Sequence, residues 1–185
     1  MSDEPRHICP VERADGLDTR LRRWLQNPRK ILGPYVREGM RVADIGCGPG
    51  FLTLDLAELV GAEGCVFAAD MQAGMLAKLR EKVRGTQLEP RITMHLCPDD
   101  RIGLPEPVDL AVAFYVVHEV PDQAAFFLEM YSSLKPDGRL LVIEPPFHVS
   151  RKDFAASVQL AREAGFAETK GPRVALSKVA IWARG

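Results

Sequence analysis

The sequence lacks long hydrophobic runs, a strong net charge and an apolar leader. No run approaches the roughly 18 apolar residues of a membrane-spanning helix. Residues 1–21 are charged throughout, unlike the apolar core of a signal peptide. The formal net charge at pH 7 is only -1, which argues against a broadly basic surface that grips nucleic acid. We therefore expect a soluble, cytoplasmic protein with no membrane span and no nucleic-acid partner.

Cysteine is scarce, and its spacing follows no metal-binding or disulfide pattern. The four cysteines, Cys9, Cys47, Cys65 and Cys97, contain no C-x-x-C pair, so neither a zinc ribbon nor a disulfide framework is predicted. Free thiols in a reducing cytosol are the expected state. We predict no metal site.

Internal repeats and low-complexity segments are also absent, and strand-like apolar runs alternate regularly with helical patterns. The length of 185 residues, with 46% hydrophobic and 26% charged residues, suits one globular domain. The alternation is typical of parallel α/β architecture. We expect strands at residues 41–45, 64–69, 91–96, 108–116 and 138–144, and helices at residues 51–59, 74–83 and 123–134.

The pattern changes after the fifth expected strand. A helix over residues 151–164 is followed by two strand-like segments, 166–169 and 174–183. The few residues between these segments, around Gly171-Pro172, are too few for a crossover helix, so the pair should be antiparallel. The predicted fold is a Rossmann-like doubly wound sheet of five parallel strands with a C-terminal antiparallel hairpin.

Two proline-containing stretches predict boundaries. Lys135-Pro136-Asp137-Gly138 is expected to end the preceding helix and turn the chain before the fifth strand. Asn27-Pro28 predicts a helix start, with Gly39 as its stop and Pro34 kinking or shortening it. We therefore divide the chain into an N-terminal segment, residues 1–27, and a domain, residues 28–185.

The stretch VADIGCGPGF, residues 42–51, places three glycines at alternate positions directly after the first strand. Glycine costs conformational entropy, so three in five residues need a local reason, such as a tight turn or a ligand lying on the main chain. We infer a ligand. In an open α/β sheet, ligands bind beyond the carboxyl ends of the strands, where backbone N–H groups and the positive end of a helix face the crevice.

The residues around this turn separate two classes of ligand. A dinucleotide fingerprint, G-x-G-x-x-G, requires glycine at position 51, where this chain has Phe51. Asp44 lies two residues before the first glycine, and its carboxylate would repel a pyrophosphate but suits a ligand with an ammonium group. The turn favours a ligand that is cationic at one end.

These residues resemble the first motif of the class I S-adenosylmethionine (SAM)-dependent methyltransferases. The resemblance continues through Asp70, Asp99-Asp100, residues 108–120 and residues 134–138 leading into Glu144. It covers roughly residues 28–185 and points to the small-molecule branch similar to ubiquinone and menaquinone biosynthesis methyltransferases. It implies the seven-stranded methyltransferase fold, SAM as cofactor, S-adenosylhomocysteine as product and a small-molecule acceptor.

The resemblance also implies cofactor contacts. Asp44 would order the glycine turn and hold the methionine amino group, directly or through water. Asp70 would accept hydrogen bonds from the ribose hydroxyls, and Met71 would pack on the adenine. Asp99 or Asp100 would accept the adenine amino group, and the choice stays open because the preceding residues depart from the family's usual Gly-Asp pair. The implied cofactor residues are Asp44, Gly46, Cys47, Gly48, Gly50, Asp70, Met71, Asp99, Asp100 and Phe114.

Methyl transfer is an in-line displacement, so alignment and exclusion of water contribute most, about 7–11 kcal/mol. A general base is needed only when the acceptor must lose a proton, and it adds about a hundredfold or more. The predicted catalytic residues are His118, Glu144, which we expect to be an exposed carboxylate, and Tyr115, which with Phe114 would line the reacting end of the methionine. The alternative is that residues 118 and 119 simply begin the following helix.

The acceptor side is expected to involve the N-terminal segment. The short connection at residues 145–150 leaves no room for a long covering insertion, so residues 1–27 are the predicted substrate lid. Arg22, Arg23 and Trp24 suit an anionic or aromatic acceptor, and His148 is a further candidate. The alternative for the arginines is a solvated basic helix face.

Three other functions stay open. A nicotinamide dehydrogenase would need the missing glycine at position 51. A non-catalytic SAM-binding or regulatory module would share the fold, since a fold shows cofactor capacity and not turnover. An arsenite-type methyltransferase would hold the metalloid on thiolates, for which Cys9 and Cys97 are the plausible partners. The acceptor atom and the oligomeric state also stay open.

Overall fold

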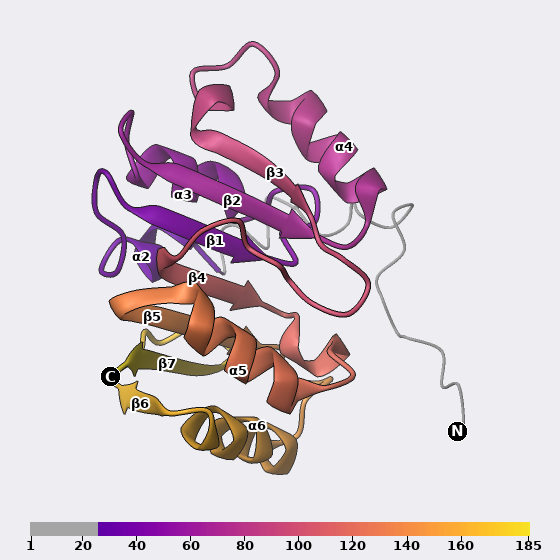
Figure 1. Cartoon of the computed structure of the whole chain (residues 1–185), viewed down its shortest axis with the longest axis vertical. Coiled ribbons are helices and arrows are strands. Elements are labelled where there is room, and N and C mark those ends of the chain that lie inside the picture. The colour runs from indigo at the N-terminus through magenta and orange to yellow at the C-terminus, as the bar shows by residue number, and fades with distance from the viewer. Residues whose placement is uncertain (1–25) are drawn as a thin grey trace.

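Seven strands form one sheet in the computed structural model of the chain, which describes residues 26–185 (Figure 1). The strands are β1 (Arg41–Ile45), β2 (Cys65–Asp70), β3 (Ile92–Leu96), β4 (Val108–Phe114), β5 (Leu134–Glu144), β6 (Phe166–Thr169) and β7 (Lys178–Arg184). Their order across the sheet is β3-β2-β1-β4-β5-β7-β6. Strands β1 to β5 pair in parallel, and β7 pairs antiparallel with both β5 and β6. The predicted parallel sheet with an antiparallel C-terminal hairpin is confirmed.

Helices cover both faces of the sheet. One hydrophobic cluster joins α2 (Pro28–Leu32), α3 (Thr53–Leu59) and α4 (Ala73–Val83) to one face. A second joins α5 (Gln123–Ser133) and α6 (Arg151–Glu163) to the other face. Successive strand residues point to opposite faces, so Val42 belongs to the first cluster and its neighbour Ala43 to the second. Burial on both faces explains why the central strands are apolar almost without interruption.

The strand order reverses between β1 and β4. These two strands are neighbours in the sheet, with β2 and β3 lying beyond β1 on one side and β5 lying beyond β4 on the other. The carboxyl ends of β1, β2 and β4 meet at one edge, on the right in Figure 1. Crevices at such a reversal are where open α/β sheets bind ligands.

Several predicted boundaries were wrong for identifiable reasons. Strand β4 ends at Phe114 because Tyr115 has a φ of 63°, which turns the chain out of the extended conformation. Strand β5 begins at Leu134, before the proline-glycine stretch, because Leu134 pairs with Val108 and the bend is absorbed by a shift in register. Strand β7 begins at Lys178, four residues later than expected.

Helix α2 begins as predicted and ends early. The side chain of Asn27 accepts a hydrogen bond from the backbone N–H of Lys30, and Pro28 is the first helical residue. The helix ends at Leu32, two residues before Pro34. Within residues 26–185 no helix combines the length and the apolar character needed to cross a bilayer.

Candidate functional site

The glycine turn joins β1 to α3 in a left-handed conformation. Gly46, Gly48 and Gly50 have φ values of 64°, 53° and 92°, a region that side chains disfavour. A Cβ at Gly46 would lie 2.5 Å from Val116 Cγ2, and one at Gly50 would lie 2.5 Å from Leu79 Cδ1. A Cβ at Gly48 would meet nothing within 4 Å. The hypothesis that a ligand accounts for all three glycines therefore needs correction. The positive φ of the turn already favours glycine at each position, and a Cβ at Gly46 or Gly50 would press on Val116 or Leu79, whereas Gly48 faces open space.

Asp70 fastens this turn to the end of β2. Its Oδ2 accepts a hydrogen bond from the backbone N–H of Gly48 at 2.9 Å, and its Oδ1 accepts one from the N–H of Gln72 at 2.8 Å. Burial raises the pKa of Asp70, and backbone hydrogen bonds from Gln72, Gly48 and Met71 oppose that rise. A nearly buried carboxylate thus lies beside the exposed backbone of the turn.

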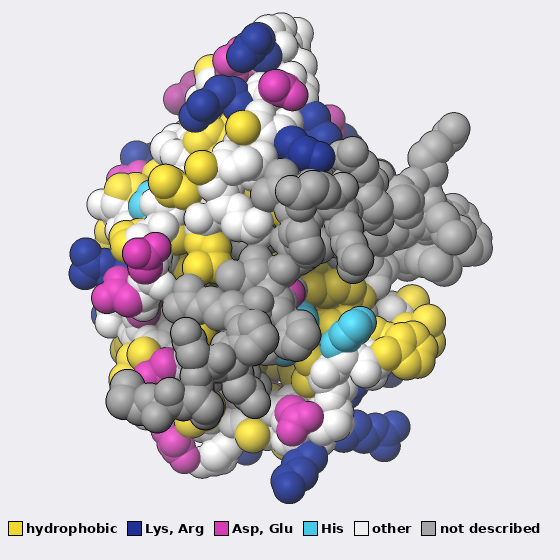
Figure 2. Space-filling model, turned by 90° about the vertical axis from the view of Figure 1, so that its right-hand side faces the viewer, with side chains coloured by type: hydrophobic (Ala, Val, Ile, Leu, Met, Phe, Trp, Pro, Cys, Tyr) yellow, Lys and Arg dark blue, Asp and Glu magenta, His cyan; other side chains and the backbone are white. Residues whose placement is uncertain are grey.

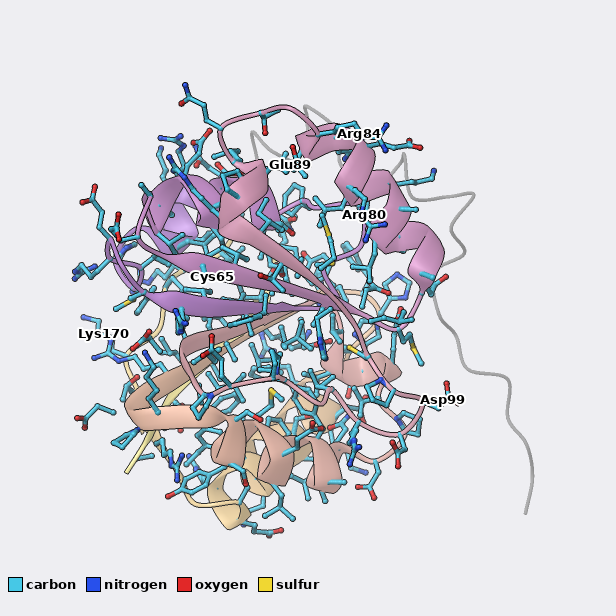
Figure 3. All side chains as sticks on the ribbon, turned by 45° about the horizontal axis from the view of Figure 1, so that its top comes forward. Cys65, Arg80, Arg84, Glu89, Asp99 and Lys170 are labelled. Atoms are coloured by element: carbon cyan, nitrogen blue, oxygen red, sulfur yellow. The ribbon has the colours of Figure 1, made fainter. Side chains whose placement is uncertain are left out.

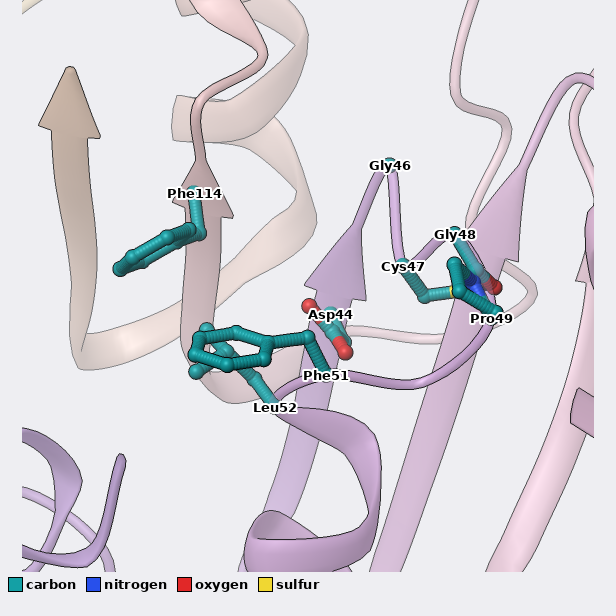
Figure 4. A pocket seen from close by; sticks show the side chains of 8 residues that line it. All are labelled: Asp44, Gly46, Cys47, Gly48, Pro49, Phe51, Leu52 and Phe114. Carbon is teal, nitrogen blue, oxygen red and sulfur yellow. The ribbon is translucent and has the colours of Figure 1, made fainter. Parts of the chain in front are cut away.

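A small cavity of about 80 Å³ lies on one side of the glycine turn (Figure 4). Figure 4 shows the carboxylate of Asp44 between the turn and the rings of Phe51 and Phe114. Asp44 is 2% exposed, and its Oδ2 accepts a hydrogen bond from Thr53 Oγ1 at 2.6 Å. Burial raises the pKa of Asp44 to about 7, against the lowering effect of the Thr53 hydrogen bond and with a further rise from the charge of Asp70. The cavity therefore presents a carboxyl group that titrates near neutrality.

A larger cleft of about 1060 Å³ lies on the other side of the turn. Gly46 and Gly48 line both cavities. Among the predicted site residues, the cleft is also lined by Asp70, Met71, Asp99 and Asp100. Met71 is 39% exposed, so it is available to a ligand and is not core filler.

The outer wall of this cleft is the loop 97–104, which α5 holds in place. Glu129 accepts two hydrogen bonds from this loop, from the backbone N–H of Ile102 at 3.0 Å and of Gly103 at 2.7 Å. The ring of His95 bonds the Ile102 carbonyl oxygen, with Nε2 and O 2.7 Å apart. Glu129 and Thr53 are structural supports of the two cavities that the sequence did not indicate.

His118 and Glu144 meet where β4 and β5 end. Glu144 is only 2% exposed, so the expectation of an exposed carboxylate was wrong. Its Oε1 accepts a hydrogen bond from the backbone N–H of Val117 at 2.9 Å, and its Oε2 lies 2.5 Å from His118 Nδ1. Partial burial lowers the pKa of His118, but the hydrogen bond and charge of Glu144, with the charge of Glu119, outweigh it and raise that pKa. Figure 2 views this edge and shows histidine side chains at the surface beside hydrophobic ones.

The helix-start interpretation of residues 118 and 119 was also wrong. Residues Val117–Glu119 form a single 3-10 turn, and α5 begins separately at Gln123 with Asp122 as its cap. The 3-10 turn is what brings the His118 ring onto Glu144.

Two other predicted residues, Tyr115 and His148, follow the ends of β4 and β5. Tyr115 stacks on Phe114 with 4.4 Å between ring centroids, and its hydroxyl bonds Ser177 Oγ at 3.0 Å and accepts from Gln26 Nε2. His148 is exposed, and its ring lies 6.4 Å from the His118 ring. Arg22, Arg23 and Trp24, with nearly all of the predicted lid, lie outside the described residues. Gly50 is buried.

Of the three described cysteines, Cys65 lies apart, whereas Cys47 and Cys97 both bond the end of β2 through their backbone N–H groups. Cys65 begins β2, at the opposite end of the sheet from the loop that carries Asp99 (Figure 3). Cys47 is buried in the glycine turn, and Cys97 lines the large cleft. Residues 26–185 contain no group of three or more His, Cys, Asp or Glu side chains that would hold a metal ion. Cys9 lies outside the described residues.

Comparisons with known proteins agree with this geometry. The family described as "Methyltransferase domain" matches residues 36–170. The chain is 32% identical over 124 residues to a ubiquinone/menaquinone biosynthesis C-methyltransferase of Geobacter sulfurreducens, covering 66% of this chain and 48% of that protein. It is 34% identical over 112 residues to a demethylmenaquinone methyltransferase of Lactobacillus johnsonii, covering 59% of this chain and 45% of that protein. It therefore spans about half the length of these relatives.

Among solved structures, the chain resembles a SAM-dependent methyltransferase from Aquifex aeolicus. The TM-score is 0.83 at 25% identity, and the match covers 95% of this chain and 98% of that one. The likeness thus extends over nearly the full length of both chains.

Proposed function

This chain belongs to the methyltransferase domain family, and on that premise we propose that it transfers a methyl group from SAM to a small-molecule acceptor. The observation that carries the proposal is the hydrogen bond from the backbone N–H of Gly48 to the carboxylate of Asp70. Gly48 lines both cavities, so this bond places the carboxylate beside the glycine turn where the two cavities adjoin. SAM is a sulfonium nucleoside with an amino-acid tail, so its amino-acid end would occupy the small cavity and its nucleoside the large cleft.

The residues present fit such a group. Asp44 in the small cavity would receive the ammonium end, and an adjacent positive charge would favour the ionised form of a carboxyl whose pKa is about 7. Asp70 would receive the ribose hydroxyls, because its carboxylate offers about four acceptor sites and the three backbone hydrogen bonds it accepts do not use them all. Met71 and one of Asp99 and Asp100 would contact the adenine at the wall of the large cleft. The bound cofactor would supply an electrophilic methyl group.

The backbone of the turn completes the proposed cofactor site. Gly46 and Cys47, which line the small cavity, would lie along the methionine and ribose. Phe114 and Tyr115 form a stacked aromatic wall at the end of β4, and such a wall attracts a sulfonium cation. We place the acceptor beyond this wall, toward His118.

The acceptor is proposed to be a small molecule on the strength of the relatives. Two of them are named for the methylation of quinone precursors, so compounds of that type come first in a screen. The N-terminal lid and the acceptor contacts of Arg22, Arg23 and Trp24 are kept as proposals from the sequence. These residues lie outside the described part of the chain.

Calorimetry with S-adenosylhomocysteine tests the proposal most directly. We expect the wild-type protein to bind it, and Asp70→Asn to bind about tenfold to a hundredfold more weakly, as the loss of a charge-assisted hydrogen bond implies. Asp137→Asn, an exposed change in the β5 bend, is the matched control and should bind normally. Wild-type protein that binds neither SAM nor its product would refute the proposal.

A second assay separates enzyme from binding module. It measures the release of S-adenosylhomocysteine when SAM is supplied together with quinone precursors, phenols, amines or arsenite as acceptors. Tight SAM binding without product from any of them would favour the non-catalytic module, and binding of NAD in place of SAM would favour the dehydrogenase.

A further inference from the structure

Two neighbouring turns at one edge of the sheet carry the most exposed large hydrophobic side chains of the described chain. Phe147, in the turn after β5, is 89% exposed, and Leu176, in the turn before β7, is 73% exposed. Glu144 at the end of β5 pairs with Lys178 at the start of β7, and Lys178 Nζ donates to the Pro146 carbonyl oxygen at 3.2 Å. These contacts hold the two turns together at the carboxyl edge of β5.

Leu176 adopts a backbone conformation that its residue type disfavours. Its φ is 57°, in a turn closed by the hydrogen bond from the Ser177 N–H to the Val174 carbonyl oxygen at 3.1 Å. Glycine or asparagine would occupy this left-handed position with less strain. A side chain so exposed contributes little to the core, so the fold does not explain a leucine here. Strain of this kind persists where a residue has a function, and an apolar side chain in solvent functions by contact with another apolar phase.

The segments that carry these two side chains are basic. Residues 145–152, PPFHVSRK, and residues 171–178, GPRVALSK, contain four Lys or Arg residues and no Asp or Glu, although the whole chain has 25 acids against 24 Lys and Arg. The four bases are Arg151, Lys152, Arg173 and Lys178. The acid that follows, Asp153, accepts the N–H of Ser150 as part of the cap of α6. Figure 2, which views this edge, shows hydrophobic side chains beside the histidines and Lys or Arg side chains below them.

Apolar side chains that protrude within a basic rim suit the surface of an anionic bilayer. Phenylalanine and leucine enter the boundary between headgroups and acyl chains, and Lys and Arg near the surface attract anionic headgroups. A fluid bilayer adapts to two separate protruding side chains, whereas a stable protein partner needs a contiguous interface of about 800 Å² on each side. We propose that these two turns dock the protein reversibly on anionic lipid membranes, with Phe147 and Leu176 inserted and the four bases against the headgroups.

Docking in this way turns the ligand-binding edge of the sheet toward the bilayer. Strands β1, β4 and β5 are parallel, so the turn after β5 lies at the same edge as the glycine turn after β1, which lines both cavities. The inference goes beyond the proposed methyl transfer, because membrane binding requires neither SAM nor an acceptor.

The first test is cosedimentation of the full chain with vesicles of phosphatidylcholine and phosphatidylglycerol, compared with vesicles of phosphatidylcholine alone. We expect the wild-type protein to bind the anionic vesicles at least tenfold more strongly and to be released by high salt, which screens the charges. Lys152→Gln should weaken binding about fivefold, and Phe147→Ser about tenfold or more.

Two matched variants are the controls for this test. Arg84→Gln removes an exposed base at the end of α4, which packs on β2 and β3 in the other half of the sheet (Figure 3). Leu128→Gln removes an apolar side chain on α5 that is 58% exposed. Both should bind the vesicles as the wild type does. Wild-type protein that ignores anionic vesicles, or Phe147→Ser that binds them equally well, would overturn the inference.

Leu176→Asn separates docking from folding. Asparagine tolerates the left-handed backbone, so urea denaturation should show equal or greater stability while vesicle binding falls about tenfold. Lower stability of Leu176→Asn or Phe147→Ser would mean that the chain itself covers these side chains, and a dimer lost in both variants would mean that a second copy does. Either result overturns membrane docking. Wild-type protein that binds S-adenosylhomocysteine but no vesicles refutes this inference alone and leaves the proposed function standing.

Discussion

Thr53 donates a hydrogen bond to the buried carboxylate of Asp44, with 2.6 Å between Oγ1 and Oδ2. Burial nevertheless raises the pKa of Asp44 from 3.8 to about 7. Between these values the folded protein keeps a proton that the unfolded chain releases, so Asp44 makes the free energy of unfolding fall as pH rises through this interval. The ionised carboxylate is therefore a cost to the unliganded protein that a cationic ligand would offset.

Asp44→Asn should stabilise the unliganded protein at alkaline pH. We expect the free energy of unfolding at pH 8 to rise by about 2–4 kcal/mol. Most of this gain should vanish at pH 4.5, which is close to the ordinary pKa of 3.8, because Asp44 is then protonated in the folded protein and the proton costs the unfolded chain little. Urea denaturation at the two pH values measures the difference, with Asp137→Asn as control. The same variant should bind S-adenosylhomocysteine more weakly, and a variant that is less stable at pH 8 would contradict the proposed cost.

Gly48→Ala should separate ligand binding from folding. Gly48 and Gly39 both have positive φ, and a Cβ at either would meet nothing within 4 Å. Both alanine variants should therefore lose about 1–2 kcal/mol of stability through backbone strain. Only Gly48→Ala should weaken S-adenosylhomocysteine binding, by about tenfold or more, because Gly39 lies at the other end of β1. Calorimetry and urea denaturation of the pair measure both effects.

Gly46→Ala provides the contrast. Its Cβ would lie 2.5 Å from Val116 Cγ2, so overpacking adds about 1–3 kcal/mol to the same backbone strain. We expect the largest loss of stability of the three variants. Normal S-adenosylhomocysteine binding by Gly48→Ala would mean that the ligand does not lie on this part of the turn.

The fold followed from the sequence because burial on both faces of the sheet leaves strand-length runs that are apolar almost without interruption. The boundaries that failed depend on features without such a pattern. Tyr115 ends β4 in a left-handed conformation normally left to glycine, and the β5 bend lies inside a strand because of a pairing between Val108 and Leu134. Neither is visible in local residue preference.

The candidate site divides in the same way. Asp44 and Asp70 lie at strand ends near the glycine turn, and spacing along the chain indicated those positions. The expectation that Glu144 is exposed failed because its burial depends on a distant partner. A 3-10 turn carries His118, 26 residues earlier in the chain, onto the Glu144 carboxylate, and nothing in the sequence indicates this contact. Glu129 was missed because its partners lie 26 and 27 residues away in a loop without a periodic pattern.

Glu129→Gln should loosen the wall of the large cleft. The carboxylate accepts two loop N–H groups, from Ile102 and Gly103, whereas an amide has one oxygen and would turn a donor toward the second N–H. We expect KM for SAM to rise about tenfold, as the loss of a hydrogen bond to a charged group implies, while kcat changes by less than about twofold. Hydrogen exchange should become faster in loop 97–104, with Glu163→Gln as control. Faster exchange at unchanged cofactor affinity would show that this loop is not part of the cofactor site.

Cys97 should be unreactive in the folded protein. Burial, with the charges of Asp70 and Glu129, raises the pKa of its thiol to about 12, so roughly one thiol in ten thousand is ionised at pH 8. Because the thiolate is both the nucleophile and the metal ligand, we expect slow alkylation by iodoacetamide at pH 8 and no retention of arsenite that depends on Cys97. Peptide mass spectrometry measures the alkylation rate, and the same reaction in urea is the reference. Alkylation as fast in the folded protein as in urea would instead show an ionised thiol in the cleft, and the arsenite-type chemistry would then regain its main requirement.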